Sequence, residues 1–204
     1  MPLIRSSSSA FEDKSPGEAA PDRTHLREDI ASDDLDVRRG AVRRALRLGD
    51  AEVLAGRLRR ESDAALRETI LTNLSRIGGV KAARALIGSL RSDDAGLRNA
   101  AIETLQNMGE CVAPEVERLL DDDDPDLRIH AVNILQSLRS PRVPDIALRV
   151  IATDPHVNVC AAAVDVLAEV GRPEMADQLR AVADRFADQP FLGFAVRAAI
   201  KRIG

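Results

Sequence analysis

The residue types that most often carry catalysis or bind metals are sparse in this chain. Its 204 residues include two cysteines, Cys111 and Cys160, and three histidines, His25, His130 and His156. The cysteines lack the C-x-x-C spacing of zinc and redox sites, and no histidine is followed by glutamate. We therefore expect the cysteines to pack as small hydrophobic residues, and His130 and His156 to make local hydrogen bonds. No cofactor, metal or catalytic site is predicted, although a helix beginning at Cys111 would make its thiol more reactive.

A run of four acidic residues, Asp121–Asp124, permits two interpretations. Carboxylates favour the N-terminal end of a helix, where they face the positive end of the helix dipole. The same run offers oxygen ligands to a divalent cation, but the alternating ligands, central glycine and distal glutamate of an EF-hand loop are absent. We favour the structural interpretation and keep cation binding as the alternative.

The charge balance argues against a nucleic-acid-binding protein. Lysine and arginine number 29 and aspartate and glutamate 33, which gives a formal net charge of -4. Nucleic-acid affinity depends mainly on neutralising phosphates with basic side chains. No apolar segment approaches the roughly 20 residues of a membrane span, and none near the N-terminus has the length of a signal-peptide core. We therefore expect a cytoplasmic protein with neither a membrane nor a nucleic-acid partner.

A motif of polar residues followed by arginine recurs about every 30 residues. Its four arginines are 29, 31 and 30 residues apart. The four copies of the motif are the segments Asp33–Arg38, Ser62–Arg67, Asp93–Arg98 and Asp123–Arg128. A fifth, weaker copy starts at Asp154 and has Cys160 in place of the arginine, and a half copy ends the chain. A fixed period of this length is typical of repeat proteins.

Each repeat predicts two helices. After the arginine, small or aliphatic residues recur at i, i+4 and i+7, for example Ala131, Leu135 and Leu138, which places them on one helix face. A second amphipathic segment follows in each full copy. Aspartate or serine before the first helix and glycine after its apolar stripe provide start and stop signals. Because sustained alternation of period two is absent, the sequence predicts an all-α protein made of helical hairpins.

These residues resemble the HEAT repeat family. Its short variety reads Asp-Pro-Asp-x-x-Val/Leu-Arg, then Ala-x-x-x-Leu and Gly. The segment Asp124–Leu135 is the closest match, with Leu-Arg directly after Asp-Pro-Asp. The resemblance covers roughly residues 33–204 and implies a right-handed α-α superhelix, a HEAT-like solenoid of about five helical hairpins plus terminal half units. We expect the solenoid domain to span residues 22–204. Cys160 in the fifth copy and Gly193 in the half copy depart from the family pattern.

The repeated arginine has a structural interpretation. A planar guanidinium can donate hydrogen bonds to carbonyls and carboxylates of the adjoining unit. We therefore expect a ladder of contacts between units, with an anion site as the alternative. The ladder consists of Arg38, Arg67, Arg98 and Arg128.

Both ends of the chain depart from the repeat. Residues 1–21 contain a run of serines and several proline and glycine residues, so we expect a disordered tail, or a short segment that docks on the solenoid or on a partner. Residues 22–31 predict a polar capping helix. Near the C-terminus, Phe186, Phe191 and Phe194 either seal the last hairpin or form an exposed patch for an oligomer or a partner.

Charge is distributed unevenly along the sequence. Residues 35–67 carry nine arginines and five acidic residues, whereas residues 103–126 carry nine acidic residues and one arginine. Because repeat units stack in order, we expect a positive N-terminal half and a negative middle, with simple solvation of the outer faces as the alternative.

In solenoids of the family that this chain resembles, the second helices line the concave surface. Their polar positions would form a broad, shallow recognition strip that suits a helix or an extended peptide. The expected partner-binding residues are Arg59, Lys81, Arg84, Arg91, Glu117, Arg142, Asp145, Arg149 and Asp177.

The predicted function is a non-catalytic scaffold or adaptor that binds a partner protein, in bacterial signalling or complex assembly. Two alternatives remain. One is an enzyme subunit similar to phycobilin lyases, which share short repeats of this kind, and the other is a homo-oligomeric structural protein that uses the Phe-rich C-terminal end. We expect a monomer, with a C-terminal dimer as the alternative.

Overall fold

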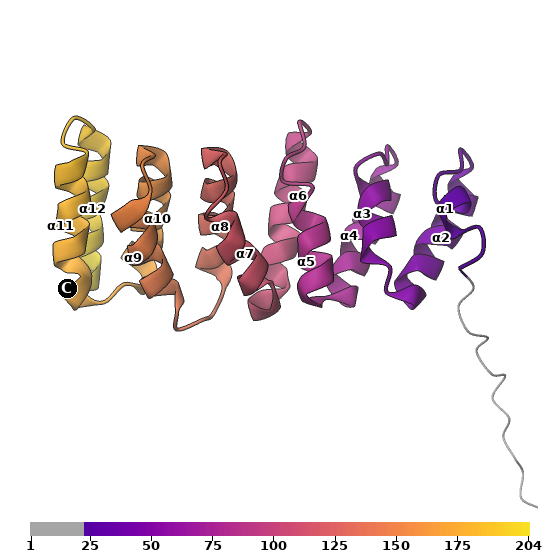
Figure 1. Cartoon of the computed structure of the whole chain (residues 1–204), viewed down its shortest axis with the longest axis horizontal. Helices are drawn as coiled ribbons and strands as arrows, with labels where there is room; N and C mark the ends of the chain where they lie inside the picture. The colour runs from indigo at the N-terminus through magenta and orange to yellow at the C-terminus, as the bar shows by residue number, and fades with distance from the viewer. Residues whose placement is uncertain (1–22) are drawn as a thin grey trace, which may run out of the picture.

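The computed structural model describes residues 23–204, which form a stack of helical hairpins (Figure 1). The helices follow one another along the long axis of the molecule in sequence order, so the first and last repeats lie at opposite ends. No β-strand occurs in this part of the chain, and none of its helices is long and apolar enough to span a bilayer. The tail expected at residues 1–21 lies outside the described residues.

The predicted arrangement of five hairpins and a final half unit is confirmed. The first helices of the units are α2 (Leu35–Leu48), α4 (Ala64–Ile77), α6 (Ala95–Asn107), α8 (Pro125–Ser137), α10 (Val157–Val170) and α12 (Pro190–Ile203). The second helices are α3 (Ala51–Leu58), α5 (Gly79–Ile87), α7 (Ala113–Leu119), α9 (Val143–Thr153) and α11 (Ala176–Arg185). Two short 3-10 segments, η1 (Gly109–Val112) and η2 (Pro173–Met175), precede α7 and α11.

The helices lie in two layers. Each first helix contacts the first helix of the next unit, from α2 through to α12. Second helices such as α3, α5 and α9 contact the first helices on both sides of them. In the view of Figure 1 this second layer lies toward the reader. We call the outer surface of α3, α5, α7, α9 and α11 the second-helix face.

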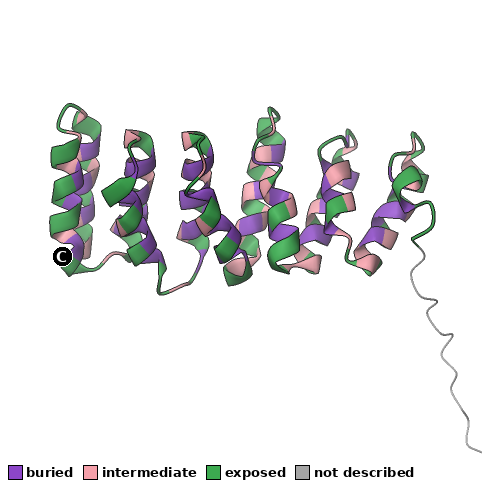
Figure 2. Cartoon of the chain, viewed as in Figure 1, coloured by how far each residue is buried: buried purple, intermediate pink, exposed green. Residues whose placement is uncertain are grey.

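Buried aliphatic side chains form one core, and Figure 2 shows that buried positions occur on helices of both layers. Leucines such as Leu54, Leu86 and Leu135 are almost completely buried. Burial of each contributes about 2 kcal/mol relative to exposure. Alanines such as Ala101 and Ala131 are buried on first helices that pack against one another, and small side chains permit close approach of such helices. The chain therefore builds its core without tryptophan or tyrosine.

Polar caps set the helix boundaries as the sequence predicts. The side chains of the N-cap aspartates accept hydrogen bonds from first-turn N–H groups in α2, α4, α6 and α8. Gly49 ends α2 with a φ of 64°, a left-handed conformation that favours glycine. Gly171 differs, because its φ is -70°. A Cβ there would lie 2.3 Å from the Leu167 carbonyl oxygen, so that glycine is required for close approach.

The ends of the stack differ in part from expectation. The capping helix expected over residues 22–31 is the single turn α1 (Leu26–Asp29), which buries Leu26 and packs against α2. At the other end Phe186 packs against the core. Phe191 and Phe194 remain 47% and 69% exposed. The last hairpin is thus sealed by one of the three phenylalanines.

Candidate functional site

Each repeat arginine folds back onto the turn that precedes its own helix. In all four units the guanidinium donates to the backbone carbonyl two residues before the capping aspartate. The pairs are Arg38 with Ser32 at 3.0 Å, Arg67 with Glu61 at 2.7 Å, Arg98 with Ser92 at 2.6 Å and Arg128 with Asp122 at 2.7 Å. These bonds satisfy carbonyls that the helices leave unpaired and fix the shape of the turn.

Two of these arginines also reach a buried carboxylate of the next unit. Arg38 donates to both oxygens of Glu61, at 3.1 and 3.3 Å. Arg128 donates to both oxygens of Asp154, at 2.7 and 3.1 Å. Such bidentate pairs hold the units in a fixed relative orientation.

The other two arginines depart from this pattern. Arg67 reaches the N-cap carboxylate of the next first helix, Asp94, at 3.0 Å. Arg98 donates to no side chain of the next unit within the described chain. The acid that corresponds in register to Glu61 and Asp154 is Asp122, and it pairs instead with Arg91. The ladder expected from the sequence therefore links units at Arg38, Arg67 and Arg128 but not at Arg98.

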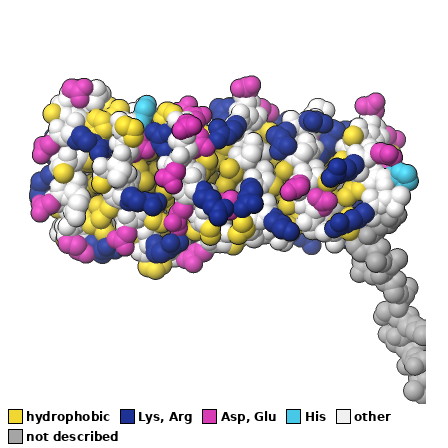
Figure 3. Space-filling model, in the orientation of Figure 1, with side chains coloured by type: hydrophobic (Ala, Val, Ile, Leu, Met, Phe, Trp, Pro, Cys, Tyr) yellow, Lys and Arg dark blue, Asp and Glu magenta, His cyan; other side chains and the backbone are white. Residues whose placement is uncertain are grey.

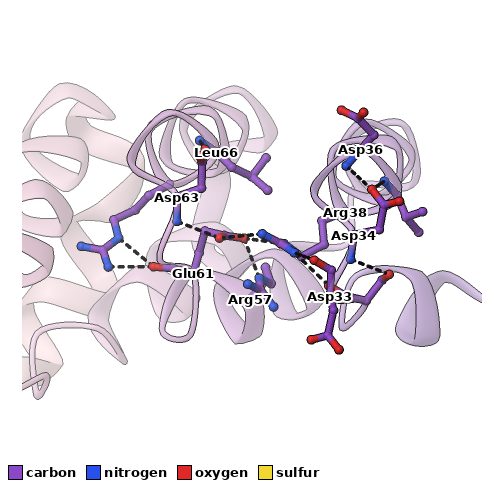
Figure 4. A network of polar contacts seen from close by, with 11 residues as sticks. Asp33, Asp34, Asp36, Arg38, Arg57, Glu61, Asp63 and Leu66 are labelled. Atoms are coloured by element: carbon purple, nitrogen blue, oxygen red, sulfur yellow. Dashed lines mark hydrogen bonds and ion pairs between the residues drawn. The ribbon is translucent and has the colours of Figure 1, made fainter.

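Glu61 lies at the centre of an Arg–Glu–Arg cluster between the first two units (Figure 4). Its side chain is fully buried and accepts from Arg38, from Arg57 at 2.7 Å and from the backbone N–H of Asp63 at 2.9 Å. Burial alone would raise the pKa of Glu61. The hydrogen bonds from Arg57, Asp63 and Arg38 outweigh that effect and lower its pKa to about 2. The carboxylate is therefore ionised at neutral pH.

A second Arg–Glu–Arg cluster lies on the second-helix face. Arg84 of α5 donates to the two carboxylate oxygens of Glu115 of α7, at 3.1 and 2.8 Å, and Arg118 donates to the same carboxylate. The hydrogen bond from Arg84 is the main reason why the pKa of Glu115 is lowered despite its burial. The side chains of Arg84 and Arg118 are 63% and 68% exposed, whereas that of Glu115 is 7% exposed. The acid thus lies beneath the two bases.

The same arrangement, an exposed arginine paired with a largely covered acid, recurs on both sides of this cluster. Arg91 pairs with Asp122, and the Nη2 atom of Arg142 donates to Oε1 of Glu117 at 2.6 Å. In both pairs the arginine side chain is about 60% exposed and the acid less than 25%. The second-helix face therefore presents guanidinium groups to solvent over α5, α7 and the start of α9, and keeps their carboxylate partners below.

At the C-terminal end of this face, the acid and not the arginine is the more exposed partner of each ion pair. Arg172 donates to Asp145 at 2.8 Å, and Arg180 donates to Asp177 at 2.6 Å. Here the acids are the more exposed partners, with Asp177 93% exposed. The face therefore loses its predominantly basic character toward α11.

Eight of the nine residues expected to bind a partner lie on the second helices or next to their ends, and Arg91 lies in the turn between α5 and α6. The structure shows that six of the nine are engaged in ion pairs, and these are Arg84, Arg91, Glu117, Arg142, Asp145 and Asp177. Arg59, Lys81 and Arg149 form no ion pair within residues 23–204.

Sequence reasoning did not identify the partners Glu115, Asp122 and Arg118. The sequence does contain a signal for two of these pairs. Arg84 and Glu115 are 31 residues apart, and so are Arg91 and Asp122. That separation is one repeat.

A pocket of about 370 Å³ lies between α7 and α9 on the second-helix face. Three guanidinium-bearing residues, Arg118, Arg142 and Arg149, line it together with Glu117 and Asp121. A larger groove of about 510 Å³ lies on the opposite face between α4 and α6, and it mixes arginines with glutamates. Positive charge therefore predominates in the pocket between α7 and α9 and not in the larger groove.

The acidic residues of the expected negative middle differ in their exposure and in their contacts. Among the acids of residues 103–126, Glu115 is buried and Glu117 is largely covered. Asp122 and Asp124 lie in the turn before α8, where Asp124 accepts the N–H of Asp126 and caps the helix. Within the run Asp121–Asp124, the side chains of Asp122 and Asp124 thus have a structural role.

The cysteines and histidines take no part in this face. Cys160 is buried, and exposed Cys111 lies in η1, where its thiol donates to the Met108 carbonyl. The Nδ1 atoms of His130 and His156 are buried and have no hydrogen-bond partner among the described residues. The expectation of local hydrogen bonds is wrong for these two atoms.

Comparison with known proteins supports the repeat assignment. Residues 112–199 match the sequence model of the HEAT repeats family, so the resemblance to that family is confirmed. No curated protein sequence matches the chain. An engineered protein of solved structure is 14% identical, with 87% of this chain and 94% of that chain covered and a TM-score of 0.39. A second engineered protein is 16% identical, with 87% and 57% covered and a TM-score of 0.41.

The complex of CpcE and CpcF of phycocyanin lyase from Nostoc sp. PCC7120 is also similar. It is 17% identical, with 94% of this chain and 99% of that chain covered and a TM-score of 0.34. Scores this low carry no inference about function.

Proposed function

We propose that this protein is a non-catalytic scaffold that binds a partner protein on its second-helix face. HEAT-repeat folds are typical of protein-interaction scaffolds, and stacked hairpins offer an extended binding surface. The proposal includes a cytoplasmic role in bacterial signalling or complex assembly, which fits a compact repeat protein.

The observation that supports this proposal most is the set of ion pairs that crosses from unit to unit on the second-helix face. Arg84 joins α5 to α7 through Glu115, and Arg142 joins α7 to α9 through Glu117. A surface fixed in this way is formed before a partner arrives, so binding loses less conformational entropy. The exposed arginines remain available to contact the partner.

Recovery of partners with charge-reversed variants tests the proposal. The chain carrying Arg84→Glu and Arg149→Glu is compared with wild type in affinity purification from the source cells. The matched control carries Arg43→Glu and Arg76→Glu, which reverse two exposed arginines of the first helices α2 and α4. We expect the second-helix variant to lose about tenfold or more of its partner recovery and the control to retain it. Equal recovery by both variants would contradict the proposal.

A further inference from the structure

We infer that the partner presents an acidic, extended segment, and that a strip of six basic side chains receives it. This inference rests on the proposed function and specifies the chemistry of the partner. The basic strip consists of Arg59, Lys81, Arg84, Arg118, Arg142 and Arg149.

The contacts place the members of the basic strip next to one another. Arg84 and Arg118 share the carboxylate of Glu115. Arg118 in turn lines the same pocket as Arg142 and Arg149. Figure 3 shows lysine and arginine side chains gathered in the middle of this face, where Figure 1 places α5 and α7.

The strip continues toward the N-terminus. Lys81 lies one turn before Arg84 on α5 and is exposed. The Nη1 atom of Arg59, at the end of α3, approaches the C-terminal end of α5, where it lies 3.7 Å from the position that a Cβ would take at Gly88. The basic strip therefore crosses α3, α5, α7 and α9.

The buried acids leave most of the arginine donors free for a ligand. A guanidinium carries five N–H donors. Arg84 uses its Nε and Nη2 atoms for Glu115, and Arg142 uses Nη2 for Glu117. The remaining N–H groups face solvent, since both side chains are more than 60% exposed. An incoming carboxylate can thus pair with arginines that the ion pairs below already hold in place.

The length of the strip sets the length of the segment. Packed helices are about 10 Å apart, so four successive second helices span about 30 Å. An extended chain advances about 3.3 Å per residue, so about ten residues cover the strip. A peptide of this length bearing several carboxylates matches both the extent and the charge of the surface.

Acidic protein fits this surface better than nucleic acid does. Aromatic side chains, on which bases stack, are absent from the strip, since the described phenylalanines lie at the C-terminal end. Asp121 and Glu117 lie beside Arg118 at the α7–α9 pocket and would repel a continuous phosphate backbone. Separate carboxylates can avoid these two acids.

Fluorescence anisotropy with a labelled peptide of about 12 glutamates tests the inference on the full chain. A peptide of glutamines of the same length and an oligothymidylate serve as the neutral and nucleic-acid probes. We expect the glutamate peptide to bind wild type, and its affinity to fall as salt rises from about 0.05 to about 0.3 M. Arg118→Glu with Arg149→Glu should weaken binding at least about tenfold. Arg43→Glu with Arg76→Glu should leave binding unchanged.

A variant expected to bind the peptide more tightly is a useful control, because misfolding would not increase affinity. Glu117→Gln removes the acid that pairs with Arg142, so the glutamate peptide should bind about two- to fivefold more tightly. Circular dichroism confirms that each variant is folded. The inference is overturned if the glutamate peptide fails to bind, or if charge reversal on either face weakens its binding equally. It is also overturned if the oligothymidylate binds more tightly through the same residues. Partner recovery that still depends on Arg84 and Arg149 would then preserve the scaffold proposal and reject only its acidic chemistry.

Discussion

In the fifth unit, Arg185 of α11 donates to the turn carbonyl that the repeat arginine contacts in the first four units, and its guanidinium lies next to Cys160. Cys160 occupies the arginine's position in the fifth repeat, and the Nη2 atom of Arg185 lies 3.1 Å from its sulfur. The same guanidinium donates to the carbonyls of Asp154 at 2.9 Å and Ala152 at 2.7 Å. Asp154 precedes the N-cap residue of α10 by two positions. In the earlier turns, the residue whose carbonyl accepts from the repeat arginine stands at the same place. The guanidinium is thus retained although it comes from the other helix of the hairpin.

Replacement of Arg185 should destabilise the C-terminal units. Arg185→Ala removes the hydrogen bonds to the turn before α10 and a stacking contact with Phe186, 4.7 Å from guanidinium to ring centre. We expect the free energy of unfolding to fall by about 2 kcal/mol and the melting temperature by about 5 °C, measured by thermal and urea denaturation. Arg180→Ala on the same helix removes only a solvent-exposed ion pair and should change the melting temperature little. Equal effects would contradict the assigned role of Arg185.

The repeat arginines should contribute unequally to stability. Arg128→Ala leaves the buried carboxylate of Asp154 without its bidentate partner, so we expect a loss of about 3 kcal/mol in urea unfolding. Arg98→Ala removes one hydrogen bond to the Ser92 carbonyl and should cost about 1 kcal/mol. Equal losses would show that the contact with the next unit adds nothing to the contact with the turn.

The fold was predictable because the first four repeats carry the same local signals. The capping aspartates, the aliphatic stripes and the 30-residue period all indicate the same hairpin, and each is read within one unit. The contribution of Arg185 was not predictable in this way. Its contact depends on a side chain that reaches back 31 residues from a different helix of the repeat.

The candidate site was only partly predictable for a related reason. Amphipathic spacing indicates which charged residues point outward from a second helix, and Arg84 and Arg149 are indeed exposed. Spacing does not tell which acids are covered by the neighbouring helix. Glu115 belongs to an acidic stretch of the sequence, yet it lies beneath Arg84 and Arg118. The sign of the surface charge therefore depends on how the units pack against one another.

Acid should remove the contribution of Glu61. The pKa of this carboxyl is lowered from 4.5 to about 2, so its stabilising effect is complete above about pH 4.5 and disappears as the pH falls toward 2. The shift corresponds to about 3 kcal/mol. In urea unfolding we expect Glu61→Gln to be less stable than wild type at neutral pH and the difference to shrink between pH 5 and 2. Glu52→Gln, an exposed position on α3, is the control. A difference independent of pH would contradict an ionised Glu61.

The C-terminal end should not support a dimer. Phe191 and Phe194 are exposed there, but the adjoining pocket of about 490 Å³ is lined by Arg180, Arg197 and Lys201 against one acid, Asp184. A two-fold contact would bring these like charges together. Light scattering after gel filtration should therefore give the mass of a monomer. A dimer that dissociates on Phe194→Ser would instead support the Phe-rich end as an oligomer interface.

Zero-length carbodiimide cross-linking tests the central claim most directly, because the chain has only three lysines, Lys14, Lys81 and Lys201. Lys81 belongs to the basic strip on the second-helix face, and Lys201 lines the basic pocket at the C-terminal end. After incubation with the glutamate peptide, mass spectrometry should find the peptide joined to Lys81 in wild type and lost from it in Arg118→Glu with Arg149→Glu. Cross-links at Lys201 in place of Lys81 would show that acidic segments bind the end of the solenoid and not its second-helix face.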